Sequence, residues 1–161
     1  GFFILVAALP ALLTSCSKDG NDLRDEVTGQ YSYTVKIFAR NGTDLVYIGD
    51  QEDHYDIVGT MNVEKNSDDP NGLNFYDGSD LMFQAEHVMD AGNAIVFDVP
   101  DQEAYIGPTR VLIAGYRYWD VQNSSYHGAF LYSDKSIEVA FTMSIMNVDT
   151  GLVMVLTAFR E

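Results

Sequence analysis

The most suggestive binding motif of the sequence is a run of aromatic and basic side chains, Tyr116, Arg117, Tyr118 and Trp119. On a β-strand, Tyr116 and Tyr118 would share one face, and the other two side chains would share the opposite face. Aromatic rings facing a barrel lumen could stack on a sugar or shelter an apolar ligand, and Arg117 could fix an anionic group. Alternatively, one face belongs to the core and the other to a half-exposed sheet surface, where Tyr and Trp are favoured.

Two acidic clusters contain atoms that could bind a cation. Residues 52–56 read Glu-Asp-His-Tyr-Asp, so carboxylates flank His54 and could hold a divalent cation or work as acid and base. Residues 68–72 read Asp-Asp-Pro-Asn-Gly and offer oxygen ligands in a turn, as a calcium loop would. The first cluster lacks a second nearby His, and the second lacks the ligand spacing of an EF-hand. A solvated hairpin end and an ordinary turn explain both, so we expect no metal.

The sequence offers no nucleophile paired with a base. The three histidines, His54, His87 and His127, fall on separate predicted strands, and the Gly-x-Ser-x-Gly elbow of hydrolases does not occur. The sequence therefore favours a protein that is not an enzyme, and it predicts no cofactor. An enzyme that uses Asp, Glu or Tyr side chains in a cavity is the less favoured alternative.

Cys16, the single cysteine, ends a segment that is typical of exported lipoproteins. Residues 2–13 form an apolar run, broken only by Pro10, that is too short to span a bilayer but fits the hydrophobic region of a signal peptide. Residues 13–16, Leu-Thr-Ser-Cys, resemble the lipobox of bacterial lipoproteins. The resemblance implies cleavage after residue 15 and acylation of Cys16. The alternative is a buried segment in which Cys16 is an inert thiol.

The expected domain organisation follows from this motif. Residues 1–15 are a signal peptide whose first part we expect to precede Gly1, and residues 16–28 are the lipidated cysteine with a polar tether. Ser17 after the cysteine resembles lipoproteins that are sent to the outer membrane. We therefore expect a lipid-anchored protein of the cell envelope, on the periplasmic or the outer face of the outer membrane.

The composition of the chain limits the number of domains and the kinds of partner that we expect. The 161 residues suffice for one domain, and a hydrophobic fraction of 47% is enough for a core. The 24 acidic and 9 basic residues give a formal net charge of -15, which argues against nucleic acid and against docking on anionic lipid. With a single cysteine, no disulfide can form within the chain.

A two-residue alternation indicates β-strands after the tether. In residues 29–40, Tyr31 and Tyr33 fall on one face, whereas Ser32 and Thr34 fall on the other. Further strands are expected at 45–49, 55–65, 73–76, 81–88, 94–99, 105–106, 110–119, 126–133, 137–148 and 152–160.

Turn residues separate these strands. Asn41-Gly42 is a strong hairpin signal because both residues tolerate positive φ, and Asp149-Thr150-Gly151 predicts a tight hairpin before the last strand. The short, regular spacing predicts one all-β domain over residues 29–161. We expect an antiparallel up-and-down meander barrel, with a β-sandwich as the alternative.

Residues at both ends of this domain resemble the calycin (lipocalin-like) lipoproteins. In that superfamily a Gly-x-Trp motif opens the first strand, and its ring packs across the closed barrel end against an Arg or Lys of the final strand. Here Gly29-Gln30-Tyr31 opens the first strand, with Tyr31 in place of Trp, and Arg160 lies on the last strand. The resemblance implies barrel closure by Gly29, Tyr31 and Arg160 through a cation–π contact and hydrogen bonds.

These features predict a membrane-anchored envelope lipoprotein whose barrel binds a small apolar or amphipathic molecule in its lumen. The alternative is a non-enzymatic interaction module with a solid-packed barrel, whose acidic surface binds another envelope protein. The volume of the barrel interior distinguishes these two functions.

Overall fold

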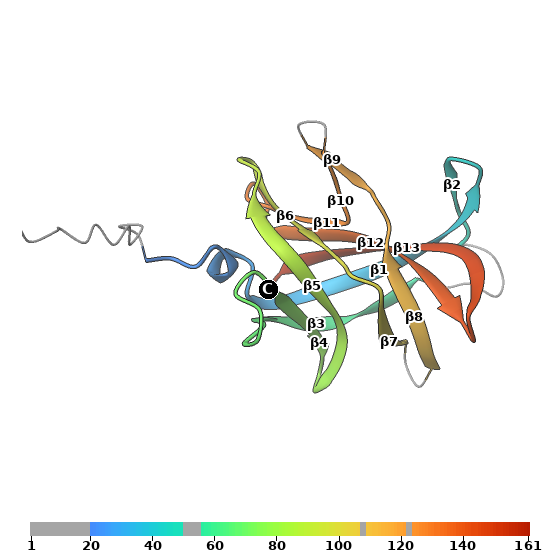
Figure 1. Ribbon diagram of the computed structural model, residues 1–161, viewed down its shortest axis with the longest axis horizontal. Coiled ribbons are helices and arrows are strands. Elements are labelled where there is room, and N and C mark those ends of the chain that lie inside the picture. Colours follow the sequence, from blue (N-terminus) through green and yellow to red (C-terminus); the bar gives the residue numbers. More distant parts are fainter. Residues whose placement is uncertain (1–19, 50–55, 107–108, 122–123) are drawn as a thin grey trace, which may run out of the picture.

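The computed structural model describes residues 20–49, 56–106, 109–121 and 124–161 (Figure 1). A short 3₁₀ helix, η1 (Leu23–Glu26), precedes the strands. The strands are β1 (Gly29–Asn41), β2 (Asp44–Tyr47), β3 (Ile57–Lys65), β4 (Leu73–Asp77), β5 (Asp80–Asp90), β6 (Ala94–Asp98), β7 (Gln102–Ile106), β8 (Thr109–Gly115), β9 (Trp119–Val121), β10 (Ser124–Tyr126), β11 (Gly128–Leu131), β12 (Ser136–Ile145) and β13 (Val148–Arg160). Within these segments, no helix is long and apolar enough to cross a membrane.

Antiparallel strands close into an eight-stranded barrel, which confirms the predicted fold class. The ring runs β11-β6-β5-β4-β3-β1-β13-β12, and the pairing of β11 with β12 closes it. β6 pairs with β11, and β7 pairs with β8. β6 and β7 therefore lie one after the other and together occupy a single strand position of the barrel. The first half of β12 pairs with β11 and its second half with β8. The barrel is therefore an up-and-down meander in which two strands are interrupted halfway.

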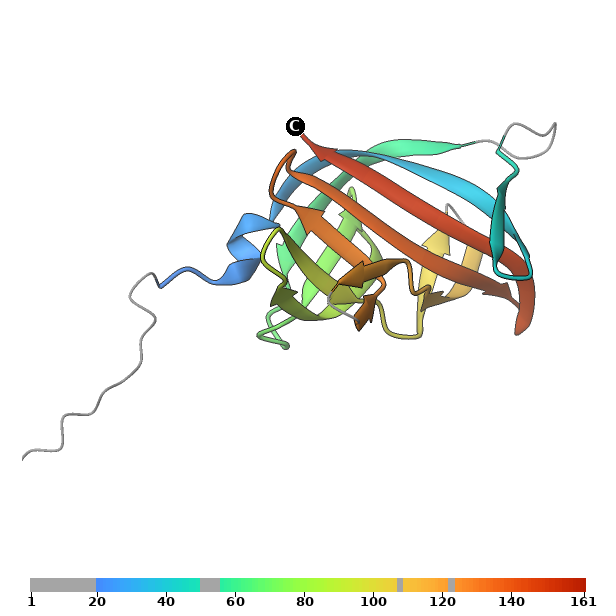
Figure 2. The same cartoon turned by 90° about the horizontal axis from the view of Figure 1, so that it is seen from above.

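Side chains alternate between the inside and the outside of the barrel wall. On β13, Met154 and Leu156 join the interior cluster, whereas Val153 and Val155 join a smaller cluster on the outside, to which Phe38 of β1 also belongs. The β9–β10 hairpin lies outside the barrel and covers a second outer cluster over β6 and β11 (Figure 2). Both surfaces of these strands are thus buried, which removes additional apolar area from water.

Phenylalanine rings fill the middle of the barrel. Phe75 and Phe83 stack with their ring centroids 4.3 Å apart, and Phe97 lies 5.8 Å from Phe75. Phe83 also contacts Phe141, with centroids 5.8 Å apart. Such pairs add about 0.5–1.5 kcal/mol each to the free energy gained by burial. These rings therefore form one connected aromatic cluster inside the barrel.

Two hairpin turns differ in detail from the prediction. The β1–β2 hairpin forms, but Asn41 already pairs with Asp44, so the turn lies one residue later, with Gly42 at φ +64. The predicted turn at residues 149–151 is wrong: Ile145 pairs with Val148, and the turn residues are Met146 and Asn147. Both have positive φ, as a type I′ turn requires, and Asn tolerates this conformation better than Met does.

Candidate functional site

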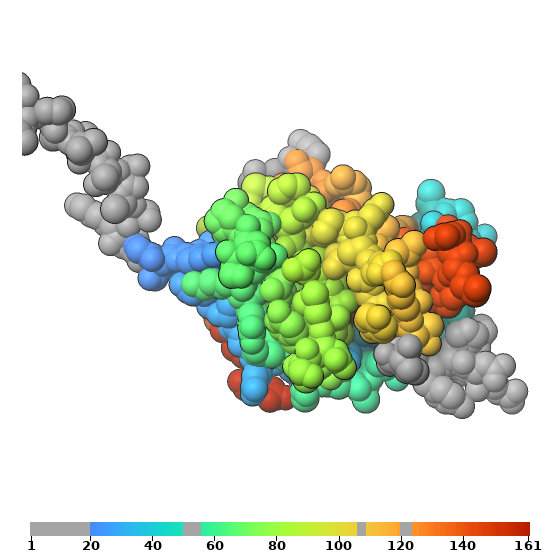
Figure 3. Space-filling model, turned by 60° about the horizontal axis from the view of Figure 1, so that its bottom comes forward, coloured from blue at the N-terminus to red at the C-terminus, as the bar shows by residue number. Residues whose placement is uncertain are grey.

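The barrel interior contains a cavity of about 240 Å³ at the end where the β4–β5 turn, the end of β7 and the start of β8 lie, called the open end below. Figure 3 shows the face on which β5 and the β7–β8 hairpin lie side by side. The volume lies slightly below the ~300–1,000 Å³ of drug-sized pockets, so the cavity suits a small molecule. Its lining is Tyr33, Val35, Ile57, Asp77, Asp80, Leu81, Met82, Phe83, Ala104, Tyr105, Ile113, Phe141 and Met154.

The polar groups of this cavity lie on β1 and on the β4–β5 turn. The Tyr33 hydroxyl donates a hydrogen bond to Asp77 Oδ2 at 2.9 Å. Burial and the neighbouring Asp77 raise the pKa of Tyr33 to about 12, so this hydroxyl stays protonated at neutral pH. Asp80 lies opposite Asp77 in the strand register. The cavity therefore combines an apolar body with an acidic edge.

Gly59 on β3 makes room for the Tyr33 ring. A Cβ atom at Gly59 would lie 2.8 Å from both Cζ and the hydroxyl oxygen of Tyr33, closer than real Cβ atoms approach. Tyr33 pairs with Gly59 in the β1–β3 register, so the ring lies across the glycine. A larger residue at this position would displace the hydroxyl from Asp77.

Two apolar residues of the lining are also open to solvent. Leu81 is 39% exposed and Tyr105 is 57% exposed. They lie on different hairpins, β4–β5 and β7–β8. Tyr105 follows the inward-facing Ala104 and pairs with the exposed Arg110, so its side chain lies on the outer side of the wall at the edge of the cavity.

The aromatic run expected to bind ligand lies elsewhere. The predicted strand over residues 110–119 is wrong at its end, because β8 stops at Gly115 and β9 begins only at Trp119. Tyr116 and Trp119 pack on the two clusters outside the barrel, and Arg117 donates to the Ser125 carbonyl. Tyr118 is 41% exposed. None of the four residues of this run, Tyr116, Arg117, Tyr118 and Trp119, belongs to the cavity lining.

The last residue of β8, Gly115, lies directly against the ring of His127. A Cβ atom at Gly115 would lie 2.1 Å from His127 Nδ1, so the His127 ring occupies the space beside this residue. His127 Nδ1 accepts a hydrogen bond from the Val99 amide at 2.9 Å. Burial lowers the pKa of His127. The neutral ring accepts the hydrogen bond of the Val99 amide in place of a backbone carbonyl of a neighbouring strand.

The three residues expected to close the barrel come together at the end opposite the cavity, called the closed end below. Tyr31 and Arg160 pair in the β1–β13 register, and Arg160 Nη2 donates to the Tyr31 hydroxyl at 2.9 Å. The guanidinium carbon lies 5.4 Å from the centroid of the Tyr31 ring. Arg160 also donates to the carbonyls of Glu26 and Thr28. Gly29 adopts φ +142, a backbone conformation that residues with a side chain rarely take.

The folded domain begins before the predicted boundary at residue 29. Asp22 caps η1 by accepting a hydrogen bond from the Arg24 amide. Val27 is fully buried in the interior cluster, and Leu23 packs against it. The last part of the expected tether at 16–28 therefore covers the closed end of the barrel.

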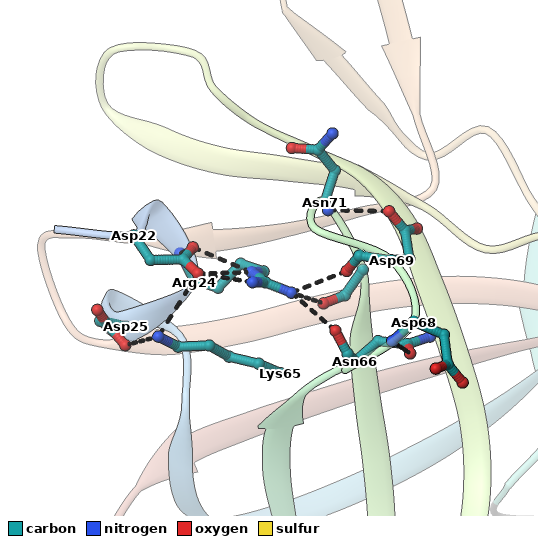
Figure 4. Close-up of polar contacts among 9 residues, drawn as sticks. Asp22, Arg24, Asp25, Lys65, Asn66, Asp68, Asp69 and Asn71 are labelled. Atoms are coloured by element: carbon teal, nitrogen blue, oxygen red, sulfur yellow. Dashed lines mark hydrogen bonds and ion pairs between the residues drawn. The ribbon is translucent and has the colours of Figure 1, made fainter. Parts of the chain in front are cut away.

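Arg24 fixes η1 to the β3–β4 loop (Figure 4). Its Nη1 donates to the carbonyls of Asn66, Asp69 and Gly72 at 3.1, 2.9 and 3.1 Å. Its Nη2 lies 2.6 Å from Asp22 Oδ2, and this pairing lowers the pKa of the Asp22 carboxyl well below its usual range. This loop contains the sequence that resembled a calcium site. Its carbonyls do converge on a cation, but that cation is the guanidinium of Arg24.

Two histidines lie near Asp98 on the outside of the barrel. His87 Nδ1 is 3.3 Å from Asp98 Oδ2, and His127 Nδ1 is 3.6 Å from Asp98 Oδ1. Asp98 follows the inward-facing Phe97, so this group is separated from the cavity by the barrel wall. Among the described residues, no three His, Cys, Asp or Glu side chains are arranged to hold a metal ion.

Two expectations concern residues outside the described segments. Cys16, with the whole apolar run before it, precedes the first described residue, Gly20. Residues 52–55 of the first acidic cluster fall in the gap between β2 and β3. Asp56, the last residue of that cluster, accepts a hydrogen bond from the Tyr47 hydroxyl at 2.6 Å.

Sequence reasoning did not single out the polar groups of the cavity. Alternation puts Tyr33 on one face of its strand together with Tyr31 and does not distinguish it from the other aromatic residues. Asp77 and Asp80 flank a Gly-Ser turn, where acidic residues are common for reasons of turn geometry alone. The sequence does contain one signal for these two residues. Asp77 directly follows the predicted strand 73–76, Asp80 directly precedes the predicted strand 81–88, and the inward residues of both strands are apolar.

Comparisons with known proteins add little. No protein-family model and no curated protein matches the sequence. Among solved structures, the ywiB protein from Bacillus subtilis aligns with 86% of this chain and 99% of its own, at a TM-score of 0.28 and 8% identity. A likeness at this level carries no argument about fold or function.

Proposed function

We propose that this protein binds a small apolar or amphipathic molecule at the open end of its barrel. The observation that supports this most is the cavity of about 240 Å³, whose lining includes the buried apolar side chains of Phe83, Ala104 and Met154. A barrel with a purely structural role would gain stability by filling this space with larger side chains. In this function the protein binds its ligand and has no catalytic role.

The alternative function, an interaction module, is favoured by the other half of the interior. There Phe75, Phe83 and Phe97 form an aromatic cluster, and the chain carries a net charge of -15 that would suit a basic partner. The two functions differ in what they require of the open end. Only ligand binding needs the cavity to stay empty of side chains.

Filling the cavity with a side chain should abolish binding without unfolding the protein. Ala104 is 4% exposed and lines the cavity, so in Ala104→Phe the new ring enters existing space. We expect the free energy of unfolding to change by less than about 1 kcal/mol. Binding of the neutral dye N-phenyl-1-naphthylamine, measured by its fluorescence, should fall at least about tenfold because the ring occupies its site.

Two variants control this experiment. Ala85 also faces the interior but lies outside the cavity lining, so Ala85→Phe should overpack the core and cost about 1–3 kcal/mol. Val58 is 72% exposed on β3, and Val58→Phe should leave both stability and dye binding unchanged. If Ala104→Phe folds and binds the dye as the unmodified protein does, ligand binding in the cavity is refuted.

We propose further that the protein is a lipid-anchored lipoprotein of the bacterial cell envelope with a calycin-like barrel. The lipobox-like Leu-Thr-Ser-Cys at residues 13–16 supports the anchor. The closed eight-stranded barrel, with Arg160 against the Tyr31 ring, supports the calycin-like architecture. Targeting to the outer membrane rests on Ser17 alone.

Substitution of Cys16 tests the anchor. In a bacterial host that expresses the full-length precursor, Cys16→Ser should abolish incorporation of labelled palmitate and leave the signal peptide uncleaved, because acylation precedes cleavage in lipoproteins. Ser17→Ala is the matched control and should be labelled normally. Labelling and membrane association that persist in Cys16→Ser would refute the lipoprotein assignment.

A further inference from the structure

The charges around the cavity indicate which molecule it takes. We propose that its ligand is a small amphipathic cation, with an apolar body in the barrel and an ammonium group held at Asp77. This inference rests on the proposed ligand-binding function and adds the charge of the ligand to it.

The described lining of the cavity carries negative charge only. It contains the carboxylates of Asp77 and Asp80, and no Lys, Arg or His. The two residues pair across the β4–β5 turn, so both carboxylates belong to one short hairpin. A bound anion would be repelled by this edge, whereas a bound cation would be attracted.

The hydrogen bond from Tyr33 prepares Asp77 to accept from a ligand. The Tyr33 hydroxyl occupies Asp77 Oδ2, and no described residue donates a hydrogen bond to the second carboxylate oxygen. Tyr33 is only 6% exposed, which fixes its ring in the wall and orients the carboxylate next to the apolar interior. Because Tyr33 keeps its proton at neutral pH, it remains a donor to Asp77 and does not itself compete for the cation.

The position of Asp77 at the rim keeps the desolvation of the ligand small. Asp77 and Asp80 are exposed, whereas Phe83, Ala104 and Met154 of the lining are buried. A ligand can therefore place its apolar body among buried side chains and leave its charge partly in water. An ion pair at such a site avoids the large penalty for burying charges and still favours the cation over a neutral analogue.

Three probes with the same apolar chain test this inference on the intact folded protein. Binding of octylammonium, 1-octanol and octanoate is measured at neutral pH by displacement of N-phenyl-1-naphthylamine. We expect octylammonium to bind about fivefold more tightly than octanol, the effect of one partly exposed ion pair, and octanoate to bind most weakly. Added salt should reduce the preference for the cation by screening.

A pair of charge-neutral substitutions locates the effect. Asp77→Asn should weaken octylammonium binding about fivefold and leave octanol binding unchanged, because the amide still accepts from Tyr33. Asp68→Asn removes the same charge from the β3–β4 loop at the closed end. It should change neither octylammonium binding nor octanol binding. Equal effects of the two variants would show that only the net charge matters and would overturn the assignment to Asp77.

The unmodified protein separates the two proposals. If octanol binds as tightly as octylammonium, the cationic ligand is refuted while ligand binding stands. If neither the dye nor any of the three probes binds, ligand binding itself is refuted, and the charge preference with it. The comparison among the three probes does not depend on the folding of any variant.

Discussion

Replacing Arg160 with methionine should lower the free energy of unfolding by about 3 kcal/mol, measured by urea denaturation. The substitution leaves the carbonyls of Glu26 and Thr28 and the hydroxyl of Tyr31 without their charged donor. Hydrogen bonds to charged groups contribute about 1.5–3 kcal/mol, and the cation–π contact adds about 0.5–1 kcal/mol. Arg160→Lys should recover only part of this loss, since one ammonium group cannot reach all three oxygens.

Arg40 provides the matched control for this experiment. It lies near the opposite end of β1 and pairs with the exposed Asp149. Exposed pairs of this kind contribute about 0–1 kcal/mol, so Arg40→Met should have a small effect. Equal losses of stability in Arg160→Met and Arg40→Met would show that Arg160 has no special role in closing the barrel.

Replacing Arg24 with methionine should destabilise the protein by a similar amount, about 2–3 kcal/mol, because three loop carbonyls lose a charged donor. The effect should be concentrated in the β3–β4 loop. The amides of Asn66 and Gly72, which hydrogen-bond within that loop, should exchange hydrogen faster, as measured by NMR. Lys65→Met removes a more exposed cation that pairs with Asp25, so its effect should be small.

The pH dependence of stability gives this variant a second readout. Arg24 lowers the pKa of Asp22 below its unfolded value, so the pair stabilises the protein fully above the usual carboxyl range. This stabilisation is lost as the pH falls through the lower pKa of the folded state. Arg24→Met should therefore be less sensitive to acid than the unmodified protein. An unchanged acid dependence together with unchanged loop exchange would refute the role assigned to Arg24.

The barrel could be predicted from sequence because its strands follow a local rule. Alternation predicts that Tyr31 and Tyr33 share one face of their strand, and the structure shows that this face is the buried one. The end of β8 at Gly115, beside the distant His127 ring, could not be predicted from this local rule. The aromatic run beyond it has the same alternation as a strand, although Tyr116 and Trp119 pack outside the barrel.

The cavity could not be predicted from the sequence, for a different physical reason. Whether space remains inside a barrel depends on the summed volumes of side chains from many strands. Phe83 and Phe141 meet at one side of the cavity, whereas the small Ala104 leaves space in the same lining. No single sequence segment contains this information. The residues at the closed end were accessible to prediction because a family resemblance, not periodicity, pointed to Gly29, Tyr31 and Arg160.

The position of η1 determines from which side a ligand can arrive. The chain enters the barrel at Asp22, at the end closed by Val27 and Arg160, whereas the cavity lies at the other end. If Cys16 carries lipid, the anchor lies a few residues before Asp22, so the chain leads from the anchor to the end of the barrel away from the cavity. A molecule dissolved in the surrounding water could then reach the cavity directly. A charged amphiphile with some aqueous solubility is suited to that route.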